Sequence, residues 1–196
     1  DMNIPTDDIL KNLTEDQLSA VTHLDGPMLV VAGAGSGKTR VVTRRIAYLI
    51  SQRIWPSQIL AMTFTNRAAR EMQERIGRLV GEAPRNVGTF HSCCARFLRQ
   101  YIEALDDGRT KDYIIFDTDD QKALLKQCLN DHPATTGLSP GFIAELISRA
   151  KSSCLTPQEI MTQEAWDNAE AIHEVCQAYE NRLRTQNAVD FDDLLL

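Results

Sequence analysis

The sequence predicts an α/β fold in which a domain with a parallel sheet is followed by a mostly helical subdomain. Three observations support this prediction. Short apolar runs alternate with helical patterns in the first half, a glycine-rich loop joins the first run to the first helix, and the pattern becomes almost wholly helical after Asp106-Asp107-Gly108. We therefore place a boundary near residue 108, which gives an α/β domain over 1–108 and a helical subdomain over 109–196.

Three short apolar runs in the first domain are predicted strands, over residues 28–32, 59–63 and 86–90. The first of them, Met-Leu-Val-Val-Ala, is continuously apolar, which is typical of a buried strand in a parallel sheet. A helical pattern follows each run, the first over residues 38–51 and the second from Asn66, the predicted N-cap. Strands that alternate with helices in this way form parallel sheets with helical crossovers.

The second half opens with one more predicted strand, residues 113–116, and continues as helices. Ser139-Pro140 and Thr156-Pro157 each combine a good N-cap with proline at the first helical position. Glu159 completes a capping box with Thr156. A long helix is expected over residues 168–185. The residues expected to face inward from it are Ile172, Val175, Cys176, Tyr179 and Leu183.

Charge is distributed unevenly along the chain. The net charge is −6, yet residues 36–100 hold twelve Lys and Arg against three Asp and Glu, a local charge of +9 that leaves −15 on the remainder. A basic block inside an acidic chain indicates either a localised anion-binding face or a set of solvated helix faces.

Cysteine usage and hydropathy restrict the class of protein. The five cysteines are odd in number and show no C-x-x-C spacing, so neither a disulfide framework nor a zinc site is supported. Reduced cysteines fit a cytoplasmic location. No apolar run approaches the ~20 residues that a membrane span needs, so no membrane partner is expected.

The glycine-rich loop carries the clearest chemistry. It departs from the phosphate-binding pattern G-x-x-x-x-G-K-[ST] only at Ala32. Its glycines let successive backbone N–H groups point at phosphate oxygens, and the following helix adds the positive end of its dipole. Lys38 is expected to reach the β- and γ-phosphates, and the Thr39 hydroxyl to ligate Mg²⁺, which makes these two the catalytic pair. The expected ATP ligands in the loop are Ala32, Gly33, Ala34, Gly35, Ser36, Gly37, Lys38 and Thr39.

The loop and several further motifs occur in an order that is typical of one family. These are Leu13-Thr14-x-x-Gln17, Ala32 to Arg40, Thr63-Phe64-Thr65-Asn66-Arg67-Ala68-Ala69, Gly88-Thr89-Phe90-His91-Ser92 and Asp190-Phe191-Asp192-Asp193-Leu194. With these motifs the chain resembles the UvrD/PcrA/Rep family of superfamily 1A DNA helicases. The resemblance implies a RecA-like P-loop NTPase domain (1A) and a helical subdomain (1B). It also implies ATP and Mg²⁺ as cofactors, and single-stranded DNA and single-strand/double-strand junctions as partners.

The resemblance implies nucleotide roles for two residues outside the glycines. Gln17 would hydrogen-bond the adenine edge, and Arg40 would lie beside the base or the sugar. Spacing alone leaves other roles open. Thr14 and Gln17 also match a capping box at a helix start, and Arg40 also fits an ordinary surface arginine.

DNA contacts are likewise implied by the resemblance, through the motifs that follow the second and third predicted strands. The residues concerned are Phe64, Thr65, Asn66, Arg67, Thr89, Phe90 and His91. A strand end that leads into a helix N-terminus can hold a DNA phosphate, and a Phe64 ring can stack on a base. Each of two residues also fits a structural role. Phe64 could lie in the core, and His91 could make a structural hydrogen bond. Asp190, Asp192 and Asp193 are expected to be structural, or to support the ATP site indirectly, and not to ligate a metal.

By the resemblance, the parent protein would be an ATP-dependent DNA helicase that moves 3′ to 5′ in repair or replication. The family's acidic D-E-x-x-D stretch is missing from the sequence. We therefore expect an N-terminal part that is truncated before this Walker B motif and is catalytically incomplete alone. A small-molecule phosphotransferase, which would need a lid of arginines, and a non-catalytic nucleotide-binding module remain open. A helicase coupled to a nuclease also fits.

Overall fold

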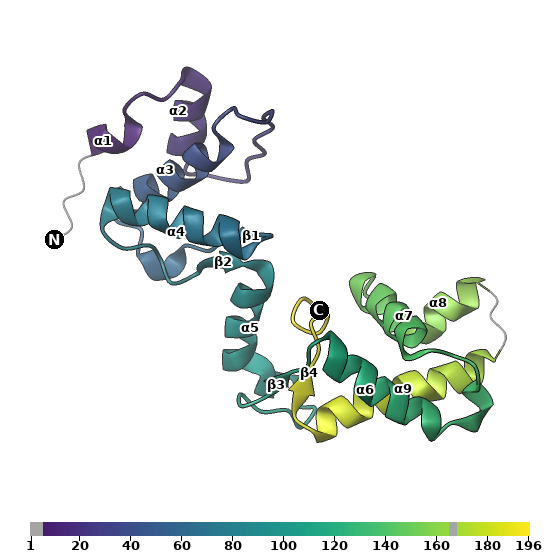
Figure 1. Ribbon diagram of the computed structural model, residues 1–196. Helices are drawn as coiled ribbons and strands as arrows, with labels where there is room; N and C mark the ends of the chain where they lie inside the picture. Colours follow the sequence, from purple (N-terminus) through teal and green to yellow (C-terminus); the bar gives the residue numbers. More distant parts are fainter. Residues whose placement is uncertain (1–5, 165–167) are drawn as a thin grey trace. The chain divides into compact units, whose positions relative to one another are not determined.

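The computed structural model describes residues 6–164 and 168–196, apart from the side chains of residues 163 and 164. It divides into two compact units, residues 1–93 and 94–196, and the division falls within helix α5 (Phe90–Tyr101). The mixed helix and strand content confirms the predicted α/β class (Figure 1). None of the described helices has both the length and the apolarity needed to cross a bilayer.

The first unit is built around a two-stranded parallel sheet with helices packed beside it. Its elements are α1 (Thr6–Leu10), α2 (Glu15–Thr22), α3 (Lys38–Ser51), the 3₁₀ turn η1 (Pro56–Gln58), β1 (Ala61–Thr63), α4 (Asn66–Val80) and β2 (Val87–Thr89). Ala61 lies opposite Val87 and Thr63 opposite Thr89, with α4 as the crossover between the strands. The predicted parallel pairing is therefore confirmed. The core joins α3 to α4 through apolar residues that include Ile46, Ile50, Met72 and Ile76.

The predicted strand over residues 28–32 is wrong. This segment is irregular, and Leu29 and Val31 are 87% and 86% exposed. A buried parallel strand needs neighbours that share its hydrogen bonds and layers that cover both of its faces. Among the described residues, the sheet of this unit contains only β1 and β2. The apolar run thus has a strand composition without the tertiary partners that would order it.

The start of α4 differs from the prediction by one residue. Thr65, and not Asn66, is the N-cap, because the Thr65 hydroxyl oxygen accepts the Ala68 N–H at 3.2 Å. Thr65 has extended backbone angles, whereas Asn66 is already helical. Asn66 therefore begins the helix and leaves its side chain exposed.

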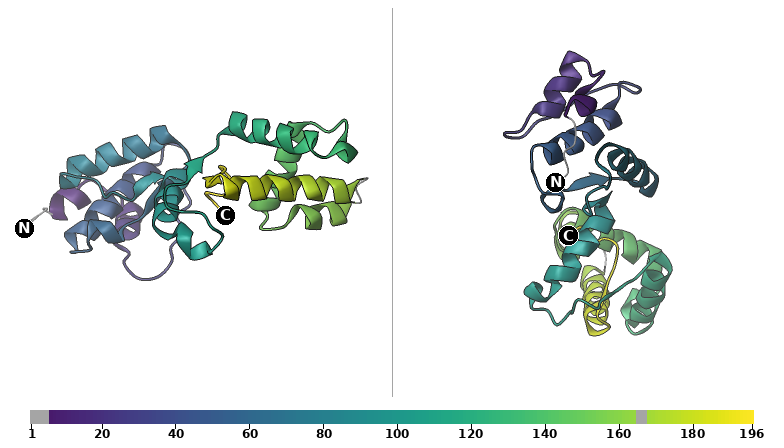
Figure 2. Two further views of the ribbon diagram at one scale, coloured as in Figure 1. Left: turned by 90° about the horizontal axis from the view of Figure 1, so that it is seen from below. Right: turned by 90° about the vertical axis from the view of Figure 1, so that its left-hand side faces the viewer.

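The second unit is mainly helical. Its elements after α5 are η2 (Ile102–Leu105), β3 (Ile114–Ile115), α6 (Thr118–Asn130), η3 (Pro133–Thr135), α7 (Pro140–Ser152), α8 (Pro157–Glu164), α9 (Ala169–Thr185) and β4 (Ala188–Val189). Helix α9 packs against α6, α7 and α8 (Figure 2), and β3 pairs with β4 in parallel. All five α9 residues predicted to face inward are buried.

Local capping sets two of these helix starts, as predicted. The Ser139 hydroxyl oxygen accepts the Phe142 N–H at 3.2 Å, and α7 begins at the intervening proline. At the start of α8 the Thr156 N–H donates to the Glu159 carboxylate at 2.6 Å. The Glu159 N–H donates to the Thr156 hydroxyl at 3.2 Å, which completes the capping box.

Candidate functional site

The phosphate-binding loop ends at the N-terminus of α3. Gly35 and Gly37 have φ angles of 77° and 87°, in the left-handed region that favours glycine. Gly37 is the N-cap of α3 and has no side chain to occupy the N–H groups of the first turn. This helix end is consequently suited to an anion, because its N–H groups and its dipole both favour negative charge.

Lys38 folds back over the loop that precedes it. Its ammonium donates to the carbonyl oxygens of Ala32 at 2.8 Å and Gly33 at 2.7 Å. The Ser36 hydroxyl donates to the same Gly33 oxygen at 2.7 Å. Lys38 and Thr39 are both exposed, so the cation and the neighbouring hydroxyl are accessible at the start of the helix.

Gln17 connects α2 to this loop. Its side-chain N–H donates to the Ser36 carbonyl at 3.1 Å, while its side-chain oxygen accepts the Thr14 N–H at 3.2 Å. The Thr14 hydroxyl accepts the Gln17 N–H, so the capping box is formed as well. A Cβ on Gly37 would lie 3.1 Å from the Gln17 amide nitrogen. The amide group retains one N–H and one lone pair with which to bind a base.

Arg40 lies in the first turn of α3 and contacts the connection between α1 and α2. Its guanidinium donates to the carbonyl oxygens of Lys11 at 3.3 Å and Asn12 at 2.8 Å. These contacts hold two main-chain oxygens and leave further N–H groups of the guanidinium for other partners.

The carboxyl ends of β1 and β2 bring the two predicted DNA-binding motifs together. Thr63 and Thr89 are paired, so Phe64 and Phe90 follow the strands at the same edge of the sheet. Their ring centroids are 5.2 Å apart and the planes are tilted by 40°. Phe64 is 90% exposed, which excludes a place in the core. Ligands typically bind at such carboxyl ends of parallel strands.

The remaining predicted DNA-binding residues lie next to Phe64 and Phe90 in the sequence, at the starts of α4 and α5. Thr65 caps α4, and the Thr89 hydroxyl accepts the Ser92 N–H at 3.2 Å near the start of α5. Asn66, Arg67 and His91 are exposed. An open cavity of about 440 Å³ on α4 is lined by Arg67, Arg70, Glu71 and Glu74.

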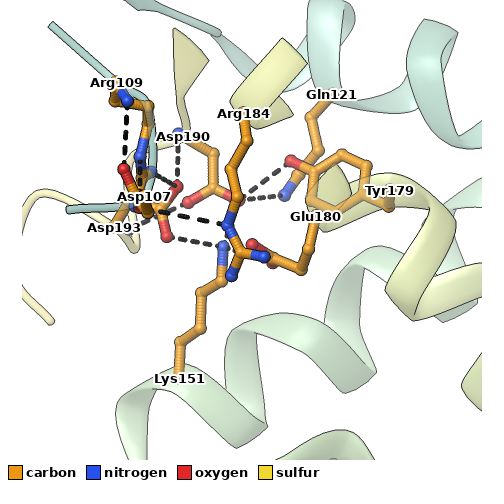
Figure 3. Close-up of polar contacts among 9 residues, drawn as sticks. All are labelled: Asp107, Arg109, Gln121, Lys151, Tyr179, Glu180, Arg184, Asp190 and Asp193. Carbon is orange, nitrogen blue, oxygen red and sulfur yellow. Dashed lines mark hydrogen bonds and ion pairs between the residues drawn. The ribbon is translucent and has the colours of Figure 1, made fainter. Parts of the chain in front are cut away.

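A second charged cluster lies in the second unit and is centred on Lys151 (Figure 3). The Lys151 ammonium is bonded to Glu180 at 2.9 Å, Asp190 at 2.9 Å and Asp193 at 2.8 Å. These three carboxylates offer oxygens within 4.8 Å of one another, a spacing that would suit a metal ion. The Lys151 ammonium places a positive charge among these carboxylates, so Asp190 and Asp193 take part in an ion-pair cluster.

Hydrogen bonds fix the turn that contains these aspartates. The Asp190 N–H donates to Asp193 at 3.1 Å, and the Asp193 N–H donates back to Asp190 at 2.9 Å. The Tyr179 hydroxyl donates to Asp190 at 2.9 Å from α9. Arg109 lies 3.6 Å from Asp193 and 2.5 Å from Asp107. The cluster therefore ties the 190–193 turn to α7, to α9 and to the loop before β3.

The balance between burial and the attraction of Lys151 differs for two of these acids, Asp190 and Glu180. Burial opposes ionisation of Asp190, but the Lys151 ammonium and hydrogen bonds from Lys151, the Asp193 N–H and Tyr179 outweigh it. The pKa of Asp190 is therefore lowered. For Glu180 burial outweighs the attraction of Lys151, and the pKa is raised. The ionised form is thus favoured by folding at Asp190 and disfavoured at Glu180.

These opposite shifts predict different pH dependence for two neutralising substitutions. Asp190 contributes stability above its unfolded pKa of about 4, and this contribution is lost as the pH falls through its lower folded pKa. Asp190→Asn should therefore destabilise the chain at neutral pH by about 2 kcal/mol, with a smaller loss in acid. Ionised Glu180 opposes folding at neutral pH, so Glu180→Gln should leave stability unchanged or higher.

The measurement is urea unfolding, followed by circular dichroism, of both variants between about pH 3 and about pH 7. Equal losses of stability for Asp190→Asn and Glu180→Gln at neutral pH would contradict the assignment of the two shifts.

Lys151, Arg44 and Arg45 were not identified as functional candidates from the sequence. A signal for Lys151 exists, because it follows Ile147 by four residues and continues the buried face of α7. A lysine on an apolar face needs a buried acidic partner. Arg44 and Arg45 belong to the basic block, yet both bind main-chain carbonyls in the N-terminal segment. Part of the expected anion-binding charge is therefore used inside the fold.

Comparison with known proteins gives one consistent result. The model of the UvrD/REP helicase N-terminal domain matches residues 13–196. The chain is 45% identical over 202 residues to the ATP-dependent DNA helicase UvrD1 of Mycobacterium tuberculosis, covering 97% of this chain and 26% of that protein. It is 43% identical over 195 residues to the ATP-dependent DNA helicase PcrA of Leuconostoc citreum, and this match covers 96% of this chain and 26% of that protein. For PcrA of Staphylococcus aureus the identity is 38% over 192 residues, and the match covers 96% of this chain and 26% of that protein. The chain thus spans about a quarter of the length of these curated relatives.

Proposed function

Because the chain belongs to the UvrD/REP helicase family, we propose that it is the ATP- and single-stranded-DNA-binding N-terminal part of an ATP-dependent DNA helicase. The whole protein would couple ATP hydrolysis to 3′ to 5′ movement and duplex unwinding at single-strand/double-strand junctions, in cytoplasmic DNA repair or replication. The observation that carries the proposal is the phosphate-binding loop at the uncapped start of α3, in a chain matched by this family from residue 13 to residue 196.

In this proposal the first domain, residues 1–108, is a RecA-like P-loop NTPase domain, and residues 109–196 form the 1B-like subdomain. The loop residues Ala32 to Thr39 bind the ATP phosphates, and Lys38 exchanges its two carbonyl contacts for phosphate oxygens. Gln17 binds the adenine edge with its spare N–H and lone pair, and Arg40 lies beside the base or sugar.

Thr39 fits a role in Mg²⁺ binding, because its exposed hydroxyl is a hard oxygen donor next to Lys38. Mg²⁺ at such sites takes few protein ligands, completes its shell with phosphate oxygens and water, and neutralises charge on the transferred phosphoryl group. No D-E-x-x-D stretch occurs among the 196 residues. We therefore expect this chain to bind ATP but to hydrolyse little of it alone.

Single-stranded DNA is proposed to cross the carboxyl edge of the β1–β2 sheet. Phe64 and Phe90 offer ring faces to the bases. The starts of α4 and α5, with Thr65, Asn66, Arg67, Thr89 and His91, would contact the backbone.

Phe64→Ala tests the DNA half of the proposal. Base stacking on an aromatic ring contributes roughly 1–3 kcal/mol, so the Kd for an unlabelled oligothymidine should rise by about tenfold or more. The Kd for ATP should change by less than about twofold, because Phe64 is exposed and its loss creates no cavity. Fluorescence anisotropy with a labelled oligothymidine as competitor measures the first value, and titration calorimetry the second.

Trp55→Ala is the matched control, since Trp55 is an exposed aromatic residue of the same unit, 71% accessible, outside the proposed DNA path. It should leave both constants unchanged. Equal weakening of DNA and ATP binding by Phe64→Ala would overturn the stacking role.

A further inference from the structure

Three arginines of α3 hold the N-terminal segment through its main-chain oxygens. Arg40, Arg44 and Arg45 each donate two hydrogen bonds to carbonyl groups between residues 8 and 23. They divide the segment among them, because Arg40 contacts the turn between α1 and α2, Arg44 contacts α1, and Arg45 contacts α2. Each arginine therefore fixes a different element against the helix that follows the phosphate-binding loop.

Arg45 holds the C-terminal end of α2. One guanidinium nitrogen donates to the Ala20 carbonyl at 3.0 Å and also to the carbonyl of His23, the C-cap. The last carbonyls of a helix have no partner within the helix and carry the negative end of its dipole. The Arg45 guanidinium directs two N–H groups at these carbonyls, which gives them hydrogen-bond partners and places a positive charge at the negative end of the dipole.

Besides Arg45, a buried apolar contact fixes α2 against α3. The buried apolar contact consists of Ala20, Val21 and Val41, flanked by half-buried side chains. Helix α2 has only eight residues, and so a length of about 12 Å. Gln17 lies near its other end and reaches the Ser36 carbonyl through a single hydrogen bond of 3.1 Å. Because α2 is this short, the way in which its far end is held affects the position of Gln17.

From this geometry, and resting on the proposed ATP-binding function, we propose that Arg45 is a positioning residue for base recognition. It orients α2 so that the Gln17 amide faces the nucleotide base. The phosphates contact N–H groups of the loop and of the first turn of α3, whereas the hydrogen bond from Gln17 on α2 engages a loop carbonyl, that of Ser36. Arg45 thus determines the part of the affinity that comes from the base, and hence the preference for ATP over other triphosphates.

Arg44 provides a matched control within the same helix. Its guanidinium donates to the Asp8 carbonyl at 2.9 Å and to that of Ile9, so it caps α1 as Arg45 caps α2. Arg44 and Arg45 are both half-buried. Arg44→Met removes the same kind of contact as Arg45→Met but leaves α2 attached.

The experiment measures Kd values for ATP, CTP and inorganic tripolyphosphate, with Mg²⁺, in the whole protein that carries this chain. Arg45→Met should raise the Kd for ATP about five- to tenfold, which corresponds to one hydrogen bond to the base. The Kd for tripolyphosphate should change by less than about twofold, so the preference for ATP over CTP falls. Arg44→Met should leave all three constants within about twofold of the wild-type values. Arg45→Lys, which retains the charge but not the planar guanidinium with its fixed N–H directions, should give an intermediate ATP preference.

An unchanged ATP preference in Arg45→Met would overturn the proposal. So would equal weakening of ATP and tripolyphosphate, because it would mean that the loop itself depends on Arg45. If circular dichroism shows that Arg45→Met does not fold, the Arg45→Lys variant takes its place. An unchanged preference for ATP over CTP in Arg45→Lys would then overturn the proposal. Failure of the proposed function would be visible in the wild type, as absent ATP binding or absent preference among the three ligands. Failure of the role of Arg45 alone would leave the wild type selective.

Discussion

Lys38→Ala is expected to raise the Kd for ATP by at least about 100-fold, because it removes the cation proposed to bind two phosphate groups. Hydrogen bonds to charged groups contribute about 1.5–3 kcal/mol each, so two of them account for a change of this size. Stability should be almost unaffected. Lys38 is exposed, and its present contacts are two carbonyl groups of an exposed loop. Titration calorimetry with ATP and Mg²⁺ measures the affinity, and thermal unfolding measures the stability.

Lys126→Ala is the control for this experiment, since Lys126 is an exposed lysine on α6 in the other unit. It should bind ATP as the wild type does. Wild-type affinity in Lys38→Ala would show that the glycine-rich loop is not the nucleotide site. A loss of affinity accompanied by unfolding would assign Lys38 to the fold rather than to the ligand.

Lys151→Met is expected to destabilise the second unit by about 3–5 kcal/mol, because it removes the cation from a buried group of carboxylates. The Lys151 side chain is 9% exposed, and Asp190 is 2% exposed. Asp190 and Asp193 would then lie side by side without a compensating charge from α7. Hydrogen exchange of the amides in α7 and α9 measures the loss within this unit itself.

Lys126→Met is the control, because it makes the same substitution at an exposed site of the same unit. It should change the free energy of unfolding by less than about 0.5 kcal/mol. Glu180→Gln combined with Lys151→Met should recover part of the loss, since it removes one of the carboxylates left without a partner. A loss below about 1 kcal/mol in Lys151→Met would mean that the cluster is solvated rather than buried.

Apart from the N-cap of α4, helices and their caps were predicted well because their determinants are local. Ser139 and Thr156 bind N–H groups three residues later, so the pattern of adjacent residues contains the whole interaction. The same holds for the phosphate-binding loop, in which glycines with positive φ directly precede a helix. Prediction of α3 over residues 38–51 was confirmed for this reason.

Features that depend on distant residues were predicted less well. The apolar run at 28–32 has a strand composition, but strand formation needs neighbours that composition does not specify. The three acidic partners of Lys151 lie 29 to 42 residues further along the chain, in α9 and in the turn after β4. Arg45 binds carbonyl oxygens, which every residue has, so no side-chain pattern marks its partners.

The irregular segment at 28–31 has a consequence for association between molecules of this chain. It presents four consecutive apolar residues without charge, and none of the described strands pairs with it. Uncharged stretches rich in valine and leucine pair readily with the same stretch of another molecule, which is how edge-to-edge aggregation begins. Because that pairing requires two molecules, it weakens on dilution, whereas the contacts within each unit do not. We therefore expect residues 28–31 to be a site at which isolated chains associate at high concentration.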